Sequence, residues 1–171
     1  MDGEKRRNLI IQRIRESDVP VSGSALAREM KVSRQVIVQD IALLRAENKN
    51  VLSTNKGYIC HEDNTKVCKK VVAVCHSNED IRDELYTIVD AGARVRDVIV
   101  EHDVYGQISV DLLISSRRDV DEFINKLESS KDKPLKILAD NIHYHTMEAL
   151  DEEALEAAEA ELKRRGFLIY N

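Results

Sequence analysis

Residues 32–45 read Val-Ser-Arg-Gln-Val-Ile-Val-Gln-Asp-Ile-Ala-Leu-Leu-Arg, and this stretch constrains the fold more than any other part of the chain. Ser33 is a favourable helix N-cap, because its hydroxyl can accept a hydrogen bond from a free backbone N–H of the first turn. Ile37, Ile41 and Leu44 recur at the spacing i, i+4, i+7, which places them on one side of a helix. The stretch therefore predicts an amphipathic helix that begins after Ser33 and packs these three side chains into a core.

The opposite side of this helix would carry polar side chains suited to DNA. Arg34, Gln35 and Gln39 lie there, and arginine and glutamine side chains hydrogen-bond to base edges in the major groove. Residues 21–30 predict a shorter helix just before it, with a tight link at residues 31–32. Two helices joined in this way are typical of a helix-turn-helix, whose second helix enters the major groove.

Two short strands are predicted after the second helix, at residues 51–54 and 58–60, around a turn at residues 55–57. This hairpin would be the wing of a winged helix, with Lys56 at its tip near a phosphate. Ser33 would support a further phosphate contact through the start of the recognition helix. A module that binds only protein could share this pattern, but the basic and amide side chains collect at the helix start that the fold directs into a groove. The pattern therefore favours DNA binding.

The distribution of charge divides the chain in two. The whole chain has a formal net charge of −5, which by itself argues against nucleic acid. Residues 1–62 contain 11 Lys and Arg against 8 Asp and Glu, a net charge of +3, and the remainder contains 15 against 23, a net charge of −8. Such asymmetry predicts that one domain meets a polyanion and the other does not. Because the basic excess is modest, we expect a homodimer that binds double-stranded DNA at two half-sites.

Length and composition limit the remaining possibilities. A chain of 171 residues that is 43% hydrophobic can bury one medium core or two small ones. It has no run of about 18 apolar residues and no apolar segment behind its charged N-terminus, so we expect a cytoplasmic protein with no membrane contact. Cys60, Cys68 and Cys75 show no paired spacing, which predicts buried free thiols rather than disulfides.

The polar segment at residues 61–66 predicts a linker between two domains. We expect a winged helix-turn-helix DNA-binding domain over residues 1–61 and a regulatory domain over residues 62–171. The second domain alternates strand and helix signals in the order β-α-β-β-α-β, which predicts a ferredoxin-like α+β fold followed by an extra helix and strand. The predicted strands cover residues 67–75, 94–102, 107–114, 141–147 and 167–170, and the predicted helices cover residues 77–91, 117–127 and 151–165.

The chemistry of the second domain lies in its histidines and one glutamate. His143 and His145 are two residues apart in a predicted strand, so they project from the same face. His76 follows another strand, and Glu84 flanks the apolar side of the next helix, where an unpaired carboxylate is costly. Three imidazoles and a carboxylate that converge would bind one borderline divalent ion such as Zn²⁺, Ni²⁺ or Fe²⁺. His102, at the end of its own strand, is a further candidate for the same pocket.

Simpler interpretations of these residues remain open. A His-x-His pair can lie on a solvent-exposed face without a metal, and Glu84 can pair with a nearby Arg or Lys. His76 can act only as the residue that precedes a helix. The spacing alone does not show that these groups meet.

Three motifs make the chain similar to a known family. They are residues 32–45, His102-Asp103-Val104-Tyr105-Gly106 and His143-Tyr144-His145-Thr146. They resemble bacterial transcriptional repressors that join a biotin-repressor-type winged helix to a three-histidine, or 3H, domain. The best-known members respond to niacin and control genes of NAD biosynthesis and nicotinate uptake. The resemblance covers essentially the whole chain.

The resemblance implies a metal site and an effector. The family's metal ligands correspond to His76, Glu84, His143 and His145. The effector is expected to be nicotinic acid, acting as a co-repressor that tightens DNA binding. Its carboxylate or ring nitrogen could occupy an open metal position, or its carboxylate could meet a cation such as Arg94 or Arg96. The expected effector pocket contains these residues: His102, Tyr105 and Arg94. One departure from the family pattern is visible at residues 138–141, which read Leu-Ala-Asp-Asn in place of a turn with threonine and glycine.

Two alternatives differ in function. A metal held by three histidines and a glutamate could activate water in a hydrolytic enzyme that uses the winged helix for docking. No further acid or nucleophile at a recognisable spacing supports that chemistry, so we expect a regulator and no catalytic residue. In the other alternative the metal is a structural zinc ion and the repressor responds to a different effector.

Overall fold

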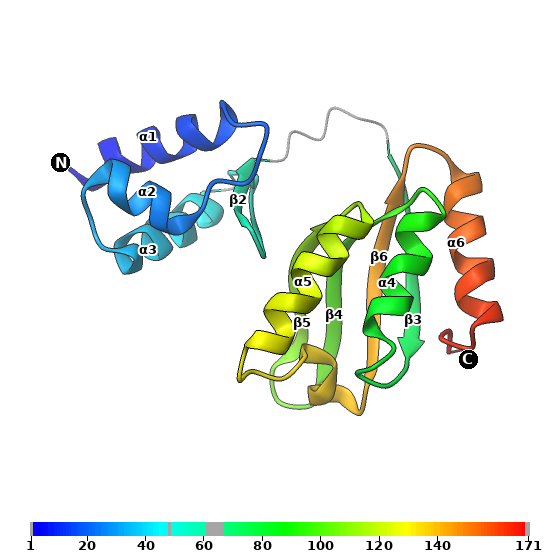
Figure 1. Cartoon of the computed structure of the whole chain (residues 1–171). Coiled ribbons are helices and arrows are strands. Elements are labelled where there is room, and N and C mark those ends of the chain that lie inside the picture. The colour runs from blue at the N-terminus through cyan, green and yellow to red at the C-terminus, as the bar shows by residue number, and fades with distance from the viewer. Residues whose placement is uncertain (1, 48, 61–66, 170–171) are drawn as a thin grey trace. The chain divides into compact units, whose positions relative to one another are not determined.

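The computed structural model describes residues 2–47, 49–60 and 67–169 and divides the chain into two compact units, residues 1–65 and 66–171 (Figure 1). Each unit has its own apolar core. The predicted linker at residues 61–66, and with it the expected boundary between residues 61 and 62, lies outside the described residues.

The described residues of the first unit form a winged helix of three helices and a two-stranded hairpin (Figure 1). Its elements are α1 (Gly3–Arg15), α2 (Gly23–Met30), α3 (Arg34–Ala46), β1 (Val51–Thr54) and β2 (Gly57–Cys60). Helix α2 begins two residues later than predicted, because the Ser22 hydroxyl accepts a hydrogen bond from the Ala25 N–H at 3.1 Å and caps the helix there. Val21 instead exchanges two backbone hydrogen bonds of 2.8 Å with Tyr58 and so extends the antiparallel hairpin of β1 and β2.

Two backbone positions with positive φ fix the shape of this unit. Lys31 has φ 55° and ends α2 in the left-handed conformation, which turns the chain toward α3. Gly57 has φ 145°, and a Cβ atom at this position would lie 2.4 Å from the carbonyl oxygen of Val21. The wing therefore requires glycine where it crosses the segment before α2.

The core of the first unit is the one that the helical spacing predicts. Ile37, Ile41 and Leu44 of α3 are buried and pack against Ile10 and Ile14 of α1 in one apolar cluster. The core thus presents the opposite side of α3 to solvent, as the helix-turn-helix prediction requires.

The second unit is an α+β domain whose element order confirms the predicted order β-α-β-β-α-β. Its elements are β3 (Cys68–Cys75), α4 (Ile81–Asp90), β4 (Arg94–His102), β5 (Gly106–Ile114), α5 (Arg117–Ser129), η1 (Leu135–Ala139), β6 (Ile142–Ala149) and α6 (Glu152–Arg164). The strands form one sheet in the order β3-β6-β4-β5, and every neighbouring pair is antiparallel. The middle of the sheet is therefore made by β4 and β6, which lie far apart in the sequence.

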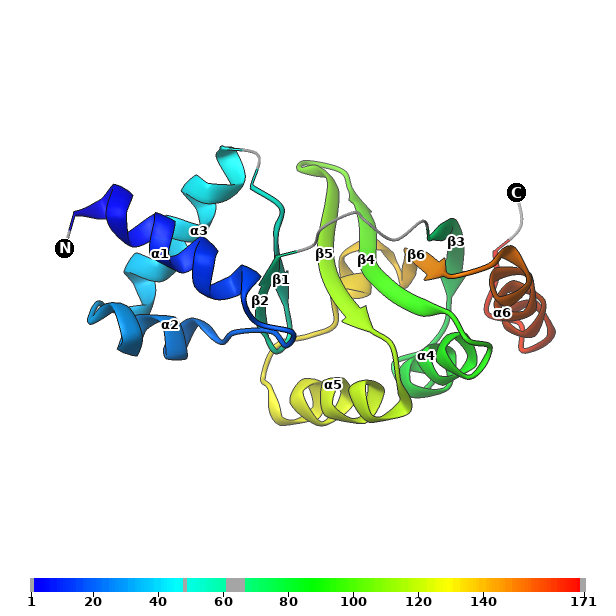
Figure 2. The same ribbon diagram turned by 90° about the horizontal axis from the view of Figure 1, so that it is seen from above.

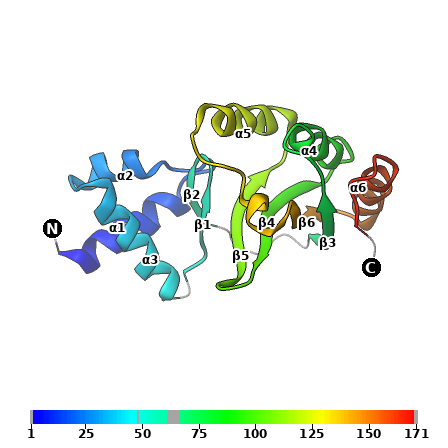
Figure 3. The same ribbon diagram turned by 90° about the horizontal axis from the view of Figure 1, so that it is seen from below.

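Helices α4 and α5 lie side by side over one face of this sheet, and α6 packs next to α4 at the β3 end (Figures 2 and 3). The core between them combines apolar side chains from every strand and from all three helices, among them Val74, Leu85, Ile114, Met147 and Leu162. Because β6 is central, the side chains on its helix-facing side are buried between sheet and helices.

Two predicted elements differ in the structure. The helix predicted from Ser77 begins at Ile81, because the Ser77 hydroxyl donates to the Asp80 carboxylate at 2.7 Å instead of capping a backbone N–H. The strand predicted at residues 167–170 is a single bridge between Val74 and Leu168, and Tyr170 lies outside the described residues. The short 3-10 helix η1 was not predicted, because its five residues are too few to show a helical period.

The expectation of buried thiols is wrong. All three cysteines are free, but Cys60 and Cys68 are half-buried and Cys75 is exposed. Cys75 lies opposite Ile142 in the register, and both side chains point away from the helices, because their neighbours Val74 and His143 are buried on the helix side. Among the helices of the described residues, none combines the length and the apolar character needed to cross a bilayer.

Candidate functional site

The exposed side of α3 carries the side chains predicted to contact DNA. Arg34, Gln35 and Gln39 are all exposed, and Gln35 and Gln39 are one helical turn apart. The Ser33 hydroxyl accepts a hydrogen bond from the Val36 N–H at 3.3 Å, so Ser33 caps the helix as predicted. Lys56 is exposed at the turn between β1 and β2. The structure thus places all five residues on the surface of one unit.

Helix α3 also carries a buried carboxylate, Asp40, which the sequence pattern did not predict. Asp40 is buried, and Arg6 of α1 donates to both of its oxygens, at 2.6 and 3.2 Å. Arg7 lies 3.8 Å from the same carboxylate. The guanidinium of Arg6 therefore joins α1 to the buried side of α3.

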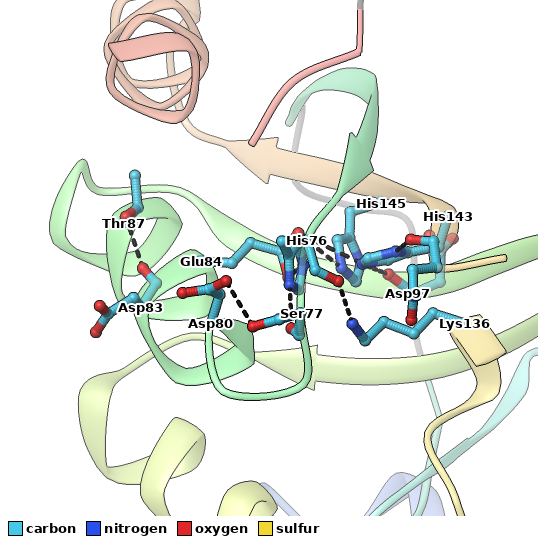
Figure 4. A network of polar contacts seen from close by, with 11 residues as sticks. His76, Ser77, Asp80, Asp83, Glu84, Thr87, Asp97, Lys136, His143 and His145 are labelled. Atoms are coloured by element: carbon cyan, nitrogen blue, oxygen red, sulfur yellow. Dashed lines mark hydrogen bonds and ion pairs between the residues drawn. The ribbon is translucent and has the colours of Figure 1, made fainter. Parts of the chain in front are cut away.

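Four side chains from three parts of the second unit converge on one buried point (Figure 4). His76 follows β3, Glu84 lies in the first turn of α4, and His143 and His145 project from β6. All four are buried, with exposed fractions of 8% for His76 and 1% for Glu84. The solvent-exposed interpretation of the His-x-His pair is therefore wrong, because the helix-facing side of this central strand is covered.

The imidazoles all direct Nε2 toward Glu84. The Nε2 atom of His76 lies 2.8 Å from Oε2 of Glu84, and those of His143 and His145 lie 3.6 and 3.3 Å from Oε1. The ligand atoms of His76, Glu84 and His143 all lie within 4.8 Å of one another, which is close enough to share one metal ion. The structure therefore assembles the predicted constellation.

A carbonyl oxygen faces the other nitrogen of each imidazole. The Nδ1 atoms of His76, His143 and His145 lie 2.8, 3.0 and 2.6 Å from the backbone oxygens of Ser77, Asn141 and Asp97. A carbonyl can only accept, so Nδ1 carries the proton and Nε2 of each neutral imidazole presents a lone pair. This second contact orients each ring in the way that metal-binding histidines require.

The four groups of the cluster form a set of electron-pair donors. Three Nε2 lone pairs and a carboxylate repel one another unless a cation or a shared proton lies between them. Oε1 of Glu84 is a buried side-chain oxygen with no hydrogen-bond partner among the described residues. Such an orphaned acceptor in a buried site is costly. The donor set therefore fits a bound divalent ion.

The pKa shifts of Glu84 and His145 also indicate a site that favours a cation. Burial alone would raise the pKa of Glu84, but His145, with His143 and His76, lowers it well below the ordinary value of 4.5. Burial alone would lower the pKa of His145, but Glu84 raises it above the ordinary value of 6.5. Glu84 is thus an anion at neutral pH, and the negative charge that favours a proton on His145 would equally favour a metal ion at this point.

A buried lysine beside the cluster was also missed. Lys136 of η1 is 3% exposed, and its Nζ donates to the carbonyl oxygen of His76 at 2.5 Å (Figure 4). Burial lowers its pKa, whereas Glu84 acts in the opposite direction. No signal in the sequence singles out this residue, because it stands in a lysine-rich segment that reads as a solvent-exposed loop.

The residues predicted to line the effector pocket do not border the cluster. Arg94 donates to Glu148, whose side chain lies on the sheet face opposite the core residue Met147. His102 accepts hydrogen bonds through Nδ1 from the N–H groups of Val104 and Tyr105 at the turn between β4 and β5, and Tyr105 is exposed. The cavity next to the cluster is lined by other residues, so the prediction of a pocket formed by His102, Tyr105 and Arg94 beside the metal is corrected.

The departure from the family pattern at residues 138–141 does not remove the turn. Asp140 and Asn141 have φ values of 50° and 68°, a conformation that Asp and Asn adopt more readily than other non-glycine residues. The turn leads into β6 and places the carbonyl of Asn141 against Nδ1 of His143.

Comparisons with known proteins agree with the division of the chain into two units. Residues 69–171 match the family model of the 3H domain, and residues 6–59 match that of an HTH domain. The probable transcription repressor NiaR of Thermotoga maritima is 45% identical over 166 residues, which cover 97% of this chain and 94% of that protein. The transcription repressor NadR of Bacillus subtilis is 37% identical over 170 residues, which cover 98% and 94%.

Proposed function

The chain belongs to the family of transcription repressors that join an HTH domain to a 3H domain, and we propose that it is a metal-containing repressor that senses nicotinic acid. Its output would be control of genes of NAD biosynthesis or niacin uptake, through binding to operator DNA in the cytoplasm. A metal-dependent enzyme is not favoured, because both relatives are named as transcription repressors.

The first unit would contact the operator. We propose that Arg34, Gln35 and Gln39 read base edges in the major groove, because they are exposed on the recognition helix of a winged helix. Ser33, at the helix start, and Lys56, at the wing, would contact phosphates. A homodimer would present two such surfaces to two half-sites and so offset the modest positive charge of one copy.

The second unit would hold the metal. We propose His76, Glu84, His143 and His145 as its ligands, and the observation that carries this proposal is the set of three Nε2 lone pairs around a buried carboxylate with an orphaned oxygen. The donors suit Ni²⁺, Zn²⁺ or Fe²⁺. When bound, the ion supplies positive charge and a position at which an anionic effector can coordinate.

Nicotinic acid is proposed as the effector on the family resemblance. For the ligand to act as a co-repressor, it must bind more tightly to the dimer arrangement whose recognition helices match the operator. A structural zinc site with another effector is the second candidate, because the near-complete burial of all four ligands is typical of structural sites.

Calorimetric titration of nicotinic acid into the metal-loaded and the chelated full-length protein tests the proposal. We expect binding to the loaded form that disappears on chelation and that tightens operator binding in a parallel anisotropy titration. Binding that is equal in both forms would leave the metal a structural role, and no binding to either form would exclude nicotinic acid as the effector. Light scattering of the same samples checks the predicted dimer.

A further inference from the structure

Arg45 lies in the last turn of α3, about three helical turns after Arg34 and on the same side of the helix. By position alone it would be one more basic side chain directed at DNA. The structure shows two acceptors for its guanidinium within the protein. Its Nε donates to the carbonyl oxygen of Val51 at 2.8 Å, and a terminal nitrogen donates to the hydroxyl of Ser53 at 2.7 Å. Both acceptors belong to β1, so Arg45 joins the recognition helix to the first strand of the wing.

The bonds from Arg45 lead on to the tip of the wing. Thr54 follows Ser53 in β1, and its hydroxyl accepts hydrogen bonds from the backbone N–H groups of Lys56 and Gly57 at 3.0 and 3.1 Å. The same hydroxyl donates to the carbonyl oxygen of Gly57 at 3.0 Å. Thr54 therefore fixes the turn that carries Lys56 relative to β1. A short path of hydrogen bonds and covalent bonds thus connects the end of α3 to Lys56.

A second attachment holds the other strand of the wing to a different part of the unit. Tyr58 of β2 exchanges two backbone hydrogen bonds with Val21, which precedes α2. These two bonds fix the wing to the segment before α2 and do not involve α3. The bonds of Arg45 therefore have a role of their own, because they hold the wing against the helix that is proposed to enter the major groove.

We propose that Arg45 is a positioning residue for DNA recognition, which holds the wing at the angle to α3 that brings Lys56 to a phosphate. The inference rests on the DNA-binding function proposed above. A guanidinium suits this task, because it is planar and directs its N–H groups toward two acceptors in fixed directions. A lysine at this position would keep the positive charge but could not hold both acceptors in the same geometry. Replacement by lysine therefore distinguishes positioning of the wing from a direct contact between Arg45 and a phosphate.

The test uses the full-length protein and a fluorescent DNA duplex that the wild type selects from a randomised pool. Anisotropy titrations at several KCl concentrations give the affinity and its salt dependence, which reports how many phosphates are contacted. We expect Lys56→Met to reduce the slope of log K against log salt concentration by about one for each bound chain. We expect Arg45→Lys, which keeps the charge, to weaken binding by about 5- to 20-fold and to reduce the slope by a similar amount, because the wing loses its phosphate contact.

Two comparisons make the result specific to the wing. Arg15→Lys is the matched control, since Arg15 is exposed in the last turn of α1, and it should change neither the affinity nor the slope. The double variant of Arg45→Lys and Lys56→Met should bind only slightly more weakly than either single variant, because both substitutions remove the same phosphate contact. A merely structural role of Arg45 would lower the melting temperature of Arg45→Lys without this overlap with Lys56→Met.

Wild-type affinity and slope in Arg45→Lys would overturn the proposal, as would losses of the two single variants that add fully in the double variant. If Arg45→Lys does not fold, Ser53→Ala decides the question, because it removes one of the two bonds and leaves every charge in place. We then expect a smaller loss in the same direction, and wild-type binding by Ser53→Ala would overturn the proposal. If the wild type selects a duplex that Arg45→Lys binds equally well, DNA binding stands and only the positioning role fails. If the wild type selects no duplex, both fail.

Discussion

Arg34 is the single residue on which DNA recognition can be tested most directly, because it is exposed at the first turn of α3. We expect Arg34→Ala to weaken operator binding by about 1–3 kcal/mol, the usual cost of losing one side-chain contact to a base edge. Fluorescence anisotropy with a labelled operator measures the loss. The metal content should not change, since the proposed metal ligands lie in the other unit.

The control for this variant is Arg118→Ala. Arg118 is an arginine of the second unit whose side chain is 87% exposed, and it pairs with Glu122 on the surface. Its removal makes the net charge of the chain more negative by the same amount but should leave operator affinity unchanged. Equal affinities of Arg34→Ala and the wild type would show that α3 does not present this face to DNA.

Glu148 is a buried carboxylate of the second unit that lies outside the histidine–glutamate cluster. It lies between Lys69, Arg94 and Arg96, and Arg94 and Arg96 donate to it directly. Burial alone would raise the pKa of Glu148, but these arginines lower it below the ordinary value of 4.5. Because all three cations are partly exposed, solvent screens the cluster, and we expect Glu148→Gln to lower the free energy of unfolding at pH 7 by about 1–3 kcal/mol.

The pH dependence of this difference follows from the sign of the shift. The folded-state pKa is depressed, so the stabilisation is fully present above pH 4.5 and is lost as the pH falls through the folded-state pKa. Urea unfolding of the wild type and Glu148→Gln from pH 3 to 7 measures it. The two proteins should converge at acid pH, whereas the exposed-pair control Glu122→Gln should differ little from the wild type at any pH.

At the scale of elements, the wing depends on one glycine. A Cβ atom on Gly57 would lie 2.4 Å from the Val21 carbonyl, in addition to the strain of a φ of 145°. Gly106 provides a matched comparison, since its φ of 70° is also positive but a Cβ atom there would meet no atom within 4 Å. We expect Gly106→Ala to cost about 1–2 kcal/mol from strain alone and Gly57→Ala to cost clearly more. Thermal unfolding of both variants measures the two losses of stability. Equal losses would contradict the close approach of Gly57 to the Val21 carbonyl.

The elements that the sequence predicts well are those with a clear period and a clear cap. Helix α3 and its buried side chains follow from the spacing of Ile37, Ile41 and Leu44 and from Ser33. The start of α4 does not, because a serine before an apolar helix predicts a cap whether its hydroxyl bonds to a backbone N–H or, as Ser77 does, to the Asp80 side chain. The later start places Glu84 in the first turn of α4, where the helix dipole favours a carboxylate.

In the candidate site, too, the sequence predicts the features that depend on local spacing and not those that depend on long-range packing. The alternation of a strand predicts that His143 and His145 share a face, but the strand order that makes β6 central cannot be read from the element order. Lys136 and the carbonyl groups that orient the imidazoles depend on long-range packing, since Lys136 meets His76 across 60 residues. Local spacing thus identifies the histidines and the glutamate of the cluster but not the cavity beside them.

At the scale of the whole molecule, the two parts that differ in net charge are also the two compact units. The positive excess lies in residues 1–62 and the acidic excess in the rest, and each compact unit has a separate apolar core. A ligand in the second unit can therefore change DNA binding by the first only by favouring one arrangement of units or copies. The free energy of that coupling must come from contacts that the ligand makes in one arrangement and not in another.

Removal of the metal distinguishes a metal site that takes part in effector binding from one that only stabilises the fold. The second unit has a core of apolar side chains from four strands and three helices that does not include the proposed metal ligands, so we expect chelation to leave it folded. Far-UV circular dichroism should be retained, while the heat of nicotinic acid binding is lost. The melting temperature should fall, because bound metal stabilises the folded state by about 2.7 kcal/mol when its free concentration is 100-fold above its dissociation constant. Glu84→Gln, which lacks the central carboxylate, should show no such fall on chelation. A cooperative loss of ellipticity in the chelated wild type would instead mean that the ion holds the fold together, and the sensor would have to lie elsewhere in the molecule.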